Sequence, residues 1–391
     1  MMKRSELRNQ VAIVGVGESQ IGKVPHMTGL GLNAQAARQA ADEVGIALSD
    51  IDGLLTAYSM TEPYFMLATV LAEYLGMQPS YSASLVVGGA TPMIMLKHAV
   101  TAVVTGEAET VLVTAGENRA TGVSRDQAVQ ALAAVGHPYQ EYLYGPQIPA
   151  FYAMIANRYM HEYGTTREQM AAVAVNARAH AVRHGNAHMN EPITIDDVLE
   201  SKPIADPLNM LDCCLISDAG GALIVTSAER AQELPTDPVY VSGLGEFHTH
   251  EHLTYAPSLT HFGAQESAAA AMQMAGVQPQ DIDFAELYDC FSIVPLITAE
   301  EIGLAERGQA GQMFLEAQTR IEGSLPINTH GGMMSHAHAG AAGGLFGIIE
   351  AVRQLRGHEG DRQVAKHDTA LVHNEGGIMS SHGTAILSRH R

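Results

Sequence analysis

The stretch Val86-Val87-Gly88-Gly89-Ala90-Thr91 decides the fold of this chain, because it links a short β-rich run to an alanine-rich helix through two glycines. The preceding residues, 81–87, favour a strand, and residues 91–104 favour a helix that ends at Gly106. A further strand is predicted over residues 110–115. Strand, glycine turn, helix and strand in this order are typical of parallel β/α layers.

The same pattern extends in both directions along the chain. Further elements are predicted as strands over 11–16, 53–57 and 222–226 and helices over 32–44, 66–75, 148–163 and 167–182. Gly45-Ile46-Ala47-Leu48-Ser49-Asp50-Ile51-Asp52 is repeated as Gly276-Val277-Gln278-Pro279-Gln280-Asp281-Ile282-Asp283, and each copy follows an alanine-rich helix. Because the two copies lie more than 200 residues apart, they indicate a duplicated domain and not a solenoid. We expect an N-terminal half over 1–235, a C-terminal half over 236–391 and a helical insertion at about 119–215.

The composition excludes several classes of partner. The 391 residues include 42 acidic and 22 basic side chains, so the net charge is −20, which disfavours nucleic acid and anionic membranes. Three cysteines, with Cys213 and Cys214 adjacent, do not make a disulfide framework, and we expect these two to pack in the core. The start of the chain does not match a signal peptide, and no apolar run is long enough to span a membrane. These features together predict a cytoplasmic protein.

Four short motifs follow the glycine turn along the chain. They are Tyr288-Asp289-Cys290-Phe291, Asn328-Thr329-His330-Gly331-Gly332, Ser335-His336-Ala337-His338 and His373-Asn374-Glu375-Gly376. Taken in this order with the glycine turn, they resemble the thiolase superfamily across essentially the whole chain, and the sterol-carrier-protein-X type in particular. The resemblance implies an α/β thiolase fold, in which duplicated β/α domains form a layered αβαβα core with an inserted helical loop domain. It also implies a homodimer that pairs through the strand at 81–87.

Three residues depart from the family pattern. In thiolases the nucleophilic cysteine precedes the helix-closing glycine by 17 residues, and counting back from Gly106 leads to Gly89. Tyr288 stands where the family has histidine or asparagine, and Ala339 stands where it has proline. Because glycine has no side chain that could carry an acyl group, the acyl-enzyme half of thiolase chemistry is excluded at this position.

The other half of thiolase chemistry needs hydrogen-bond donors around a thioester oxygen and an acid or base. An aldol cleavage of a β-hydroxyacyl-CoA passes through such an enolate and needs no nucleophile. We assign proton transfer to Tyr288 and Cys290. The candidate hydrogen-bond donors are Asn328, His330, His338 and His373. The residues expected to shape the substrate site are Gly88, Gly89, Asn328, Asn374 and Gly376.

A cysteine-less subgroup of the superfamily also resembles this chain: the thiolase-like aldolases of steroid side-chain degradation. This resemblance implies a retro-aldolase in which Tyr288 and His338 form the proton-transfer pair. It also implies a small OB-fold and zinc-ribbon partner protein, which fits the lack of a basic stretch for binding CoA. Coenzyme A would enter as part of the substrate, and no covalently bound cofactor is expected.

Each of these residues also has a structural interpretation. Tyr288 fits a strand-end aromatic residue, Cys290 an inert core thiol, and the asparagines fit turn-forming roles. His330 and His373 could serve as loop hydrogen-bonding groups. His248, His250 and His252 alternate as in a strand, but a solvated face is favoured over a metal site, and we assign no metal ligand.

Two other functions remain open. One is an acyltransferase or condensing enzyme of thiolase type, in which Cys290 or a partner supplies the thiol. The other is a non-catalytic acyl-CoA-binding subunit of a complex.

Overall fold

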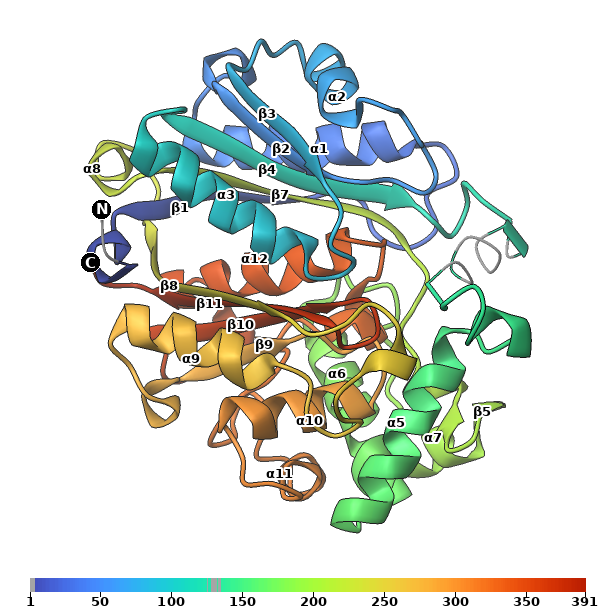
Figure 1. The fold of residues 1–391 in the computed structure, drawn as a ribbon. Helices are drawn as coiled ribbons and strands as arrows, with labels where there is room; N and C mark the ends of the chain where they lie inside the picture. The colour runs from blue at the N-terminus through green and yellow to red at the C-terminus, as the bar shows by residue number, and fades with distance from the viewer. Residues whose placement is uncertain (1–3, 125, 128–131, 133–134) are drawn as a thin grey trace.

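The computed structural model describes residues 4–124, 126–127, 132 and 135–391. Within them, nine strands form one mixed sheet in the order β3-β2-β4-β7-β1-β8-β11-β10-β9 (Figure 1). The first five strands come from the N-terminal part of the chain and the last four from the C-terminal part. The strands are β1 (Val11–Glu18), β2 (Gly53–Ala57), β3 (Tyr81–Leu85), β4 (Thr110–Asn118), β7 (Asp218–Ser227), β8 (Val239–His248), β9 (Phe284–Leu287), β10 (Thr369–Gly376) and β11 (Ser381–Ser388).

Helices join these strands in nearly the predicted places. Helix α3 (Thr91–Thr105) is closed by Gly106, whose φ of 74° is the left-handed conformation that glycine adopts without strain. The helices are α1 (Gly29–Val44), α2 (Leu67–Leu75), α3 (Thr91–Thr105), α8 (Ala228–Ala231), α9 (Ala264–Ala275), α10 (Ile293–Ile302), α11 (Ala310–Leu315) and α12 (Ala342–Arg356). A π-helical turn, η7, covers Gly332–His336.

The topology repeats itself between the two parts of the sheet. The order β2-β4-β7-β1 corresponds to β9-β10-β11-β8, with α1 matched by α9 and α3 matched by α12. The counterpart of β3 is reduced to one parallel bridge between Ala285 and Ile327. The expectation of parallel layers is only partly correct. The pairs β2–β3, β2–β4 and β9–β10 are parallel, whereas β7 and β11 are antiparallel to their neighbours.

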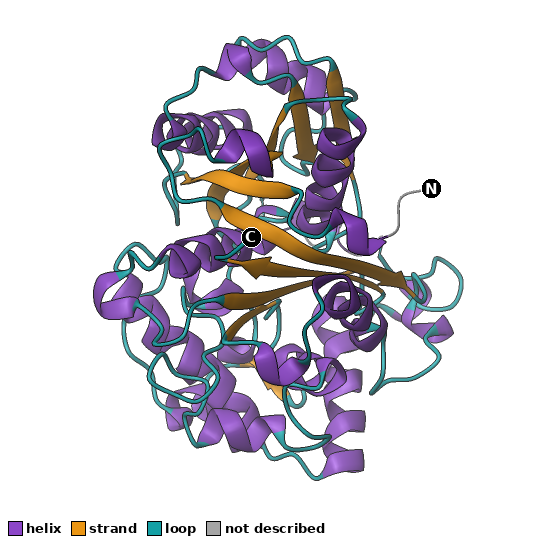
Figure 2. Ribbon diagram, turned by 90° about the vertical axis from the view of Figure 1, so that its left-hand side faces the viewer, coloured by secondary structure: helices purple, strands orange, loops and turns teal. Residues whose placement is uncertain are grey.

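The layers follow the predicted αβαβα order. Helices α3 and α12 lie between the two parts of the sheet, and Figure 2 shows helices flanking the strands. In β1, Val11 and Ile13 face this middle layer, while Ala12 and Val14 face α1 on the outside. Because successive strand residues point to opposite faces, a strand buried on both sides is apolar on both, as β1 is from Val11 to Gly17.

A helical segment is inserted between β4 and β7. It contains α5 (Ile148–Tyr163), α6 (Arg167–His184), α7 (Ile195–Glu200) and the hairpin of β5 (Pro203–Ala205) with β6 (Leu208–Asn209). Its apolar side chains share a core with α9, α10 and β9, so the insertion packs against the C-terminal half. Among the helices described, none combines the length and the apolar character needed to cross a membrane.

Candidate active site

The turn between β3 and α3 brings the chain to the centre of the molecule. Thr91 closes it, because its hydroxyl accepts a hydrogen bond from the Val87 N–H at 2.9 Å and donates to the Gly88 carbonyl at 2.6 Å. Gly88 has a φ of 55°, and a Cβ atom there would lie 2.7 Å from the Gly377 backbone nitrogen. The turn therefore requires glycine at this position, and it presses against the loop that follows β10.

The side chain of Tyr288 occupies the space beside Gly89. A Cβ atom built on Gly89 would overlap the Tyr288 hydroxyl and the Glu375 carbonyl oxygen. Tyr288 follows β9 directly and is 7% exposed. Burial, with smaller contributions from Cys290 and Glu375, raises the pKa of the Tyr288 phenol well above its usual range. The phenol is therefore a neutral hydroxyl at physiological pH.

His338 faces the Tyr288 hydroxyl. Its Nε2 lies 3.5 Å from the phenolic oxygen, and the two rings meet edge to face at 87°. Its Nδ1 lies 3.0 Å from Cys214 Sγ. Burial first, and Arg119 second, lower the pKa of His338 to about 3. With its proton on Nδ1, the neutral imidazole presents Nε2 as an acceptor for the phenolic O–H.

A buried carboxyl group, that of Glu375, also acts on Tyr288. The Glu375 Oε1 accepts hydrogen bonds from the Tyr152 hydroxyl at 2.6 Å and from Cys290 Sγ at 3.3 Å. Burial raises the pKa of Glu375 to about 7. Burial, followed by the charge of Glu375, raises the pKa of the Cys290 thiol well above its usual range. Cys290 is therefore a protonated thiol and a poor nucleophile.

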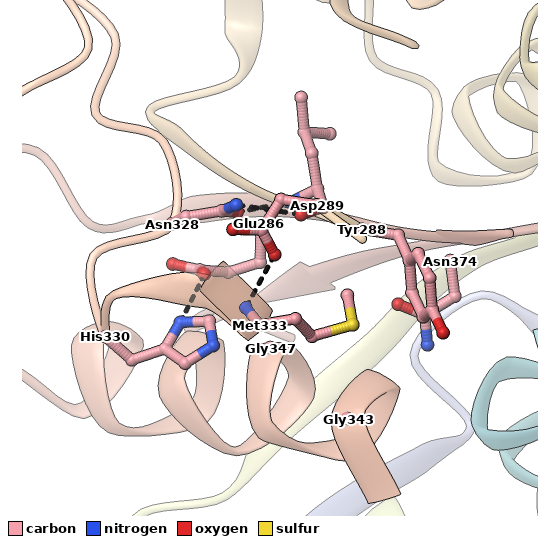
Figure 3. A pocket seen from close by; sticks show the side chains of 10 residues that line it. Glu286, Tyr288, Asp289, Asn328, His330, Met333, Gly343, Gly347 and Asn374 are labelled. Carbon is pink, nitrogen blue, oxygen red and sulfur yellow. Dashed lines mark hydrogen bonds and ion pairs between the residues drawn. The ribbon is translucent and has the colours of Figure 1, made fainter. Parts of the chain in front are cut away.

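A second polar cluster lies behind Tyr288, around a cavity with room for about one water molecule (Figure 3). His330 Nδ1 lies 2.9 Å from Glu286 Oε2 in a buried ion pair. Asp289 accepts a hydrogen bond from the Met333 N–H at 2.6 Å, and burial raises the pKa of its carboxyl to about 6. This cluster supports the strand end from which Tyr288 projects.

Several predicted site residues have their polar atoms engaged elsewhere. Asn328 bonds both backbone groups of Leu287, at 2.7 and 2.9 Å, and so extends the sheet pairing beside β9. His373 contacts Thr384 and His382, on the outer side of the sheet. The side-chain groups of these two residues that were expected to donate to a thioester oxygen therefore bond other groups of the protein in this structure.

Asn374 and Gly376 lie closer to the glycine turn. The Asn374 amide donates to the Gly344 carbonyl at 3.0 Å, at the first turn of α12. A Cβ atom on Gly376 would overlap the Val87 carbonyl oxygen, so this glycine is needed for the two loops to meet. Both residues shape the backbone around Gly89.

Sequence reasoning did not identify four residues of this site, which are Glu375, Cys214, Tyr152 and Arg119. Cys213 and Cys214 both pack against the core, as predicted, and the Cys214 sulfur also contacts His338. Glu375 carried one signal, since an acidic residue at the end of a buried strand needs partners. Cys214 and Tyr152 come from the insertion, and neither has a local pattern that marks it.

The histidines do not form the arrangement considered for a metal. His250 bonds the Ile378 carbonyl and His252 the Val135 carbonyl, so they do not converge with His248. Within the described part of the chain, only Glu18, His184 and His336 come close enough together to share an ion. Arg353 already pairs with Glu18 at 2.8 Å, so that group is a satisfied ion pair.

Acidification is expected to destabilise this protein. Burial lowers the pKa of eight histidines, whereas it raises the pKa values of Glu375 and Asp289 to about 7 and about 6. A histidine whose pKa is lowered on folding binds its proton more readily in the unfolded chain. Each such histidine therefore lowers the free energy of unfolding by up to about 1.4 kcal/mol per pH unit as the pH falls below about 6.5, and Glu375 and Asp289 oppose this effect. The eight histidines are His180, His184, His188, His250, His336, His338, His373 and His382.

Urea unfolding at pH 7, 6 and 5 measures this slope. His184→Gln removes one of the groups that the unfolded chain protonates, so the slope should decrease by up to one proton. Stability that is constant or rises on acidification would contradict the assignment of these histidines as neutral.

The fold and the glycine turn indicate a thiolase-like protein, and comparisons with known proteins indicate the same class. The model of the family described as "Thiolase C-terminal domain-like" matches residues 245–389. Acetyl-CoA acetyltransferase of Methanothermobacter thermautotrophicus is 32% identical, over 97% of this chain and 99% of that protein. The chain therefore belongs to the thiolase superfamily.

Within that superfamily, relatives with lyase names are equally similar. The 17-hydroxy-3-oxo-4-pregnene-20-carboxyl-CoA lyase of Mycobacterium tuberculosis is 34% identical, over 90% of this chain and 92% of that protein. The steroid side-chain-cleaving aldolase of Thermomonospora curvata is 35% identical, with the same coverage. A solved structure titled "Ltp2-ChsH2(DUF35) aldolase" superimposes with a TM-score of 0.85 and 32% identity, covering 98% of each chain.

Proposed function

We propose that this protein cleaves a β-hydroxyacyl-CoA by a retro-aldol reaction that forms no acyl-enzyme. The proposal depends on one observation, that a phenol takes the place of the thiolase nucleophile at the centre of the site. The phenol of Tyr288 fills the space beside Gly89, where a thiolase has its nucleophile, and His338 faces that phenol. The relatives named as a lyase and an aldolase support the same reaction.

The proposed steps follow from the protonation states of the two residues. The β-hydroxyl of the substrate gives its proton to the Tyr288 oxygen, while the phenolic proton passes to His338 Nε2. The bond between Cα and Cβ then breaks, and its electron pair forms the thioester enolate while Cβ becomes a ketone or aldehyde carbon. Cys290 then donates a proton to Cα of the enolate, which gives the shortened acyl-CoA. Positioned proton transfer of this kind contributes roughly 10²–10⁴-fold to a rate.

The enolate oxygen needs donors other than Asn328 and His373, whose side chains are engaged elsewhere. Helices α3 and α12 begin at Thr91 and Ala342, just after Gly89 and His338. Neither N-terminus is capped by a side-chain hydrogen bond. The positive ends of both helix dipoles thus favour negative charge between them, and we assign oxyanion stabilisation to their first turns.

The substrate and partners are inferred from the relatives. We propose a bulky acyl-CoA, such as a steroid side-chain thioester, because two relatives carry names of steroid substrates. We also propose a small OB-fold and zinc-ribbon partner, since the similar solved structure is titled as a complex. A homodimer through β3, coenzyme A held only as part of the substrate, and a cytoplasmic location complete the proposal. Three free cysteines are in keeping with that location.

The test is to incubate the protein with a panel of β-hydroxyacyl-CoA thioesters, with and without a partner of that kind. We expect release of a ketone or aldehyde together with the shortened acyl-CoA in equal amounts. Intact-mass measurement during turnover should show no acyl adduct on the chain. Products without an equivalent amount of carbonyl compound would contradict the proposal.

An acyltransferase is the second candidate, because acetyl-CoA acetyltransferases are also similar over nearly the whole chain. It requires an acylated thiol, and Cys290 is the one cysteine that lies beside Tyr288 and Glu375. A mass increase on Cys290 after incubation with acetyl-CoA would favour this reaction. The high pKa of that thiol argues against it.

A further inference from the structure

Glu375 is a buried carboxylate at the end of β10, and its side chain has no role in the reaction steps given above. It is 1% exposed. Its Oε1 accepts hydrogen bonds from Tyr152 and Cys290, and its Oε2 accepts one from the Met379 N–H at 3.0 Å. A phenol, a thiol and a backbone amide are all neutral donors, so none of them balances the charge of the carboxylate.

The thiol of Cys290 is 6% exposed and has Glu375 as its hydrogen-bond acceptor. The other titratable groups that interact with it are Tyr152, Cys214 and Tyr288, and all three are neutral when protonated. Ionising Cys290 would therefore place two negative charges within 3.3 Å of each other in a buried site. Such a pair strongly resists double ionisation.

We propose that Glu375 is a positioning residue that holds Cys290 as a neutral thiol, so that Cys290 donates a proton and does not accept an acyl group. The donation itself rests on the proposed retro-aldol reaction. In that step the Cys290 S–H bond breaks, the enolate electron pair forms the new Cα–H bond, and the thiolate regains a proton from solvent. His338 releases the β-hydroxyl proton to solvent, so one proton leaves and one enters the site in each turnover.

This arrangement explains a second requirement of the site. Loss of the cysteine at position 89 removes one nucleophile, but a reactive thiolate at Cys290 would still attack the carbonyl carbon of a bound thioester. A neighbouring carboxylate suppresses the thiolate form, which is the nucleophilic one. Glu375 thus separates proton donation from acyl transfer on the same sulfur atom.

The test is a thiolate titration that needs no substrate. Absorbance at 240 nm is followed from pH 7 to 11, and the curve of Cys290→Ala is subtracted from that of the wild type. The same difference is taken between Glu375→Gln and the double variant E375Q/C290A. We expect the midpoint for Cys290 to fall by about one pH unit or more in Glu375→Gln. Glu375→Asp, which keeps the charge, should restore a high midpoint.

Glu300→Gln is the matched control. Glu300 is also buried and also accepts a hydrogen bond from a phenol, that of Tyr159, but it lies on α10 away from Cys290. Its substitution should leave the Cys290 midpoint unchanged. An unchanged midpoint in Glu375→Gln, or an equal shift in Glu300→Gln, would overturn the proposal.

If Glu375→Gln does not fold, the reciprocal measurement uses Cys290→Ala alone. Loss of the thiol donor must raise the pKa of Glu375. The infrared band of the protonated carboxyl should then persist to higher pH than in the wild type. A band that disappears at the same pH as in the wild type would overturn the proposal. Because neither titration uses an acyl-CoA, they remain informative if no ketone is released. Ketone release with an unshifted titration would leave the lyase function standing and reject the role of Glu375.

Discussion

Replacement of Tyr288 by phenylalanine is expected to lower kcat for C–C cleavage by about 10²–10⁴-fold, with little change in KM. The phenylalanine ring would keep the packing against Gly89, whereas the hydroxyl that faces His338 at 3.5 Å is lost. Only the transfer of the β-hydroxyl proton is removed, so the effect should be on the chemical step. Steady-state kinetics with the best substrate of the acyl-CoA panel measure both constants.

Variants of His338 test whether it acts on the same proton as Tyr288. His338→Ala should cost a similar factor, and the double variant should be only slightly worse than either single one, because both residues act on the same proton. Tyr159→Phe is the control, since it removes a buried phenol that bonds Glu300 and not His338. Multiplying losses in the double variant would mean that the two residues act independently. An unchanged kcat of Tyr288→Phe would show that Tyr288 does not transfer the β-hydroxyl proton.

Much of the fold could be predicted because its signals are local. Gly45, Gly106 and Gly276 end helices in the left-handed conformation, and residues 53–57 form the predicted strand. Strand direction was harder, because it depends on the connection between strands. The long insertion before β7 and the short link between β10 and β11 reverse the chain, so both strands run antiparallel to their neighbours.

The active site was only partly predictable for a related reason. Tyr288, His338 and Gly89 lie at the ends of elements whose order the motifs reveal, and the structure brings them together. The identity of a residue as histidine or asparagine does not show to which side of the sheet its side chain points. His373 and Asn374 are neighbours on β10, so they face opposite sides of the sheet, and only Asn374 faces the middle layer.

Restoring a cysteine at position 89 is expected to inactivate the enzyme and to destabilise the fold. The Cβ atom would overlap the Tyr288 hydroxyl and the Glu375 carbonyl oxygen, so one or both must move. Overpacking of this kind costs about 1–3 kcal/mol of the free energy of unfolding. Gly31→Cys is the matched control, because a Cβ atom there meets its nearest neighbour at 3.5 Å, an ordinary contact. Urea unfolding and the lyase assay measure the two effects.

A double variant separates the phenol from the backbone in this clash. In G89C/Y288A the ring is gone, so part of the lost stability should return, whereas lyase activity should stay absent because no phenol remains to relay the proton. The coupling free energy between positions 89 and 288 should therefore be favourable. Additive losses would mean that the Glu375 carbonyl alone excludes a side chain at position 89. A stable and acylated Gly89→Cys would mean that Tyr288 does not fill the place of the missing thiol, and the lyase assignment would lose its main support.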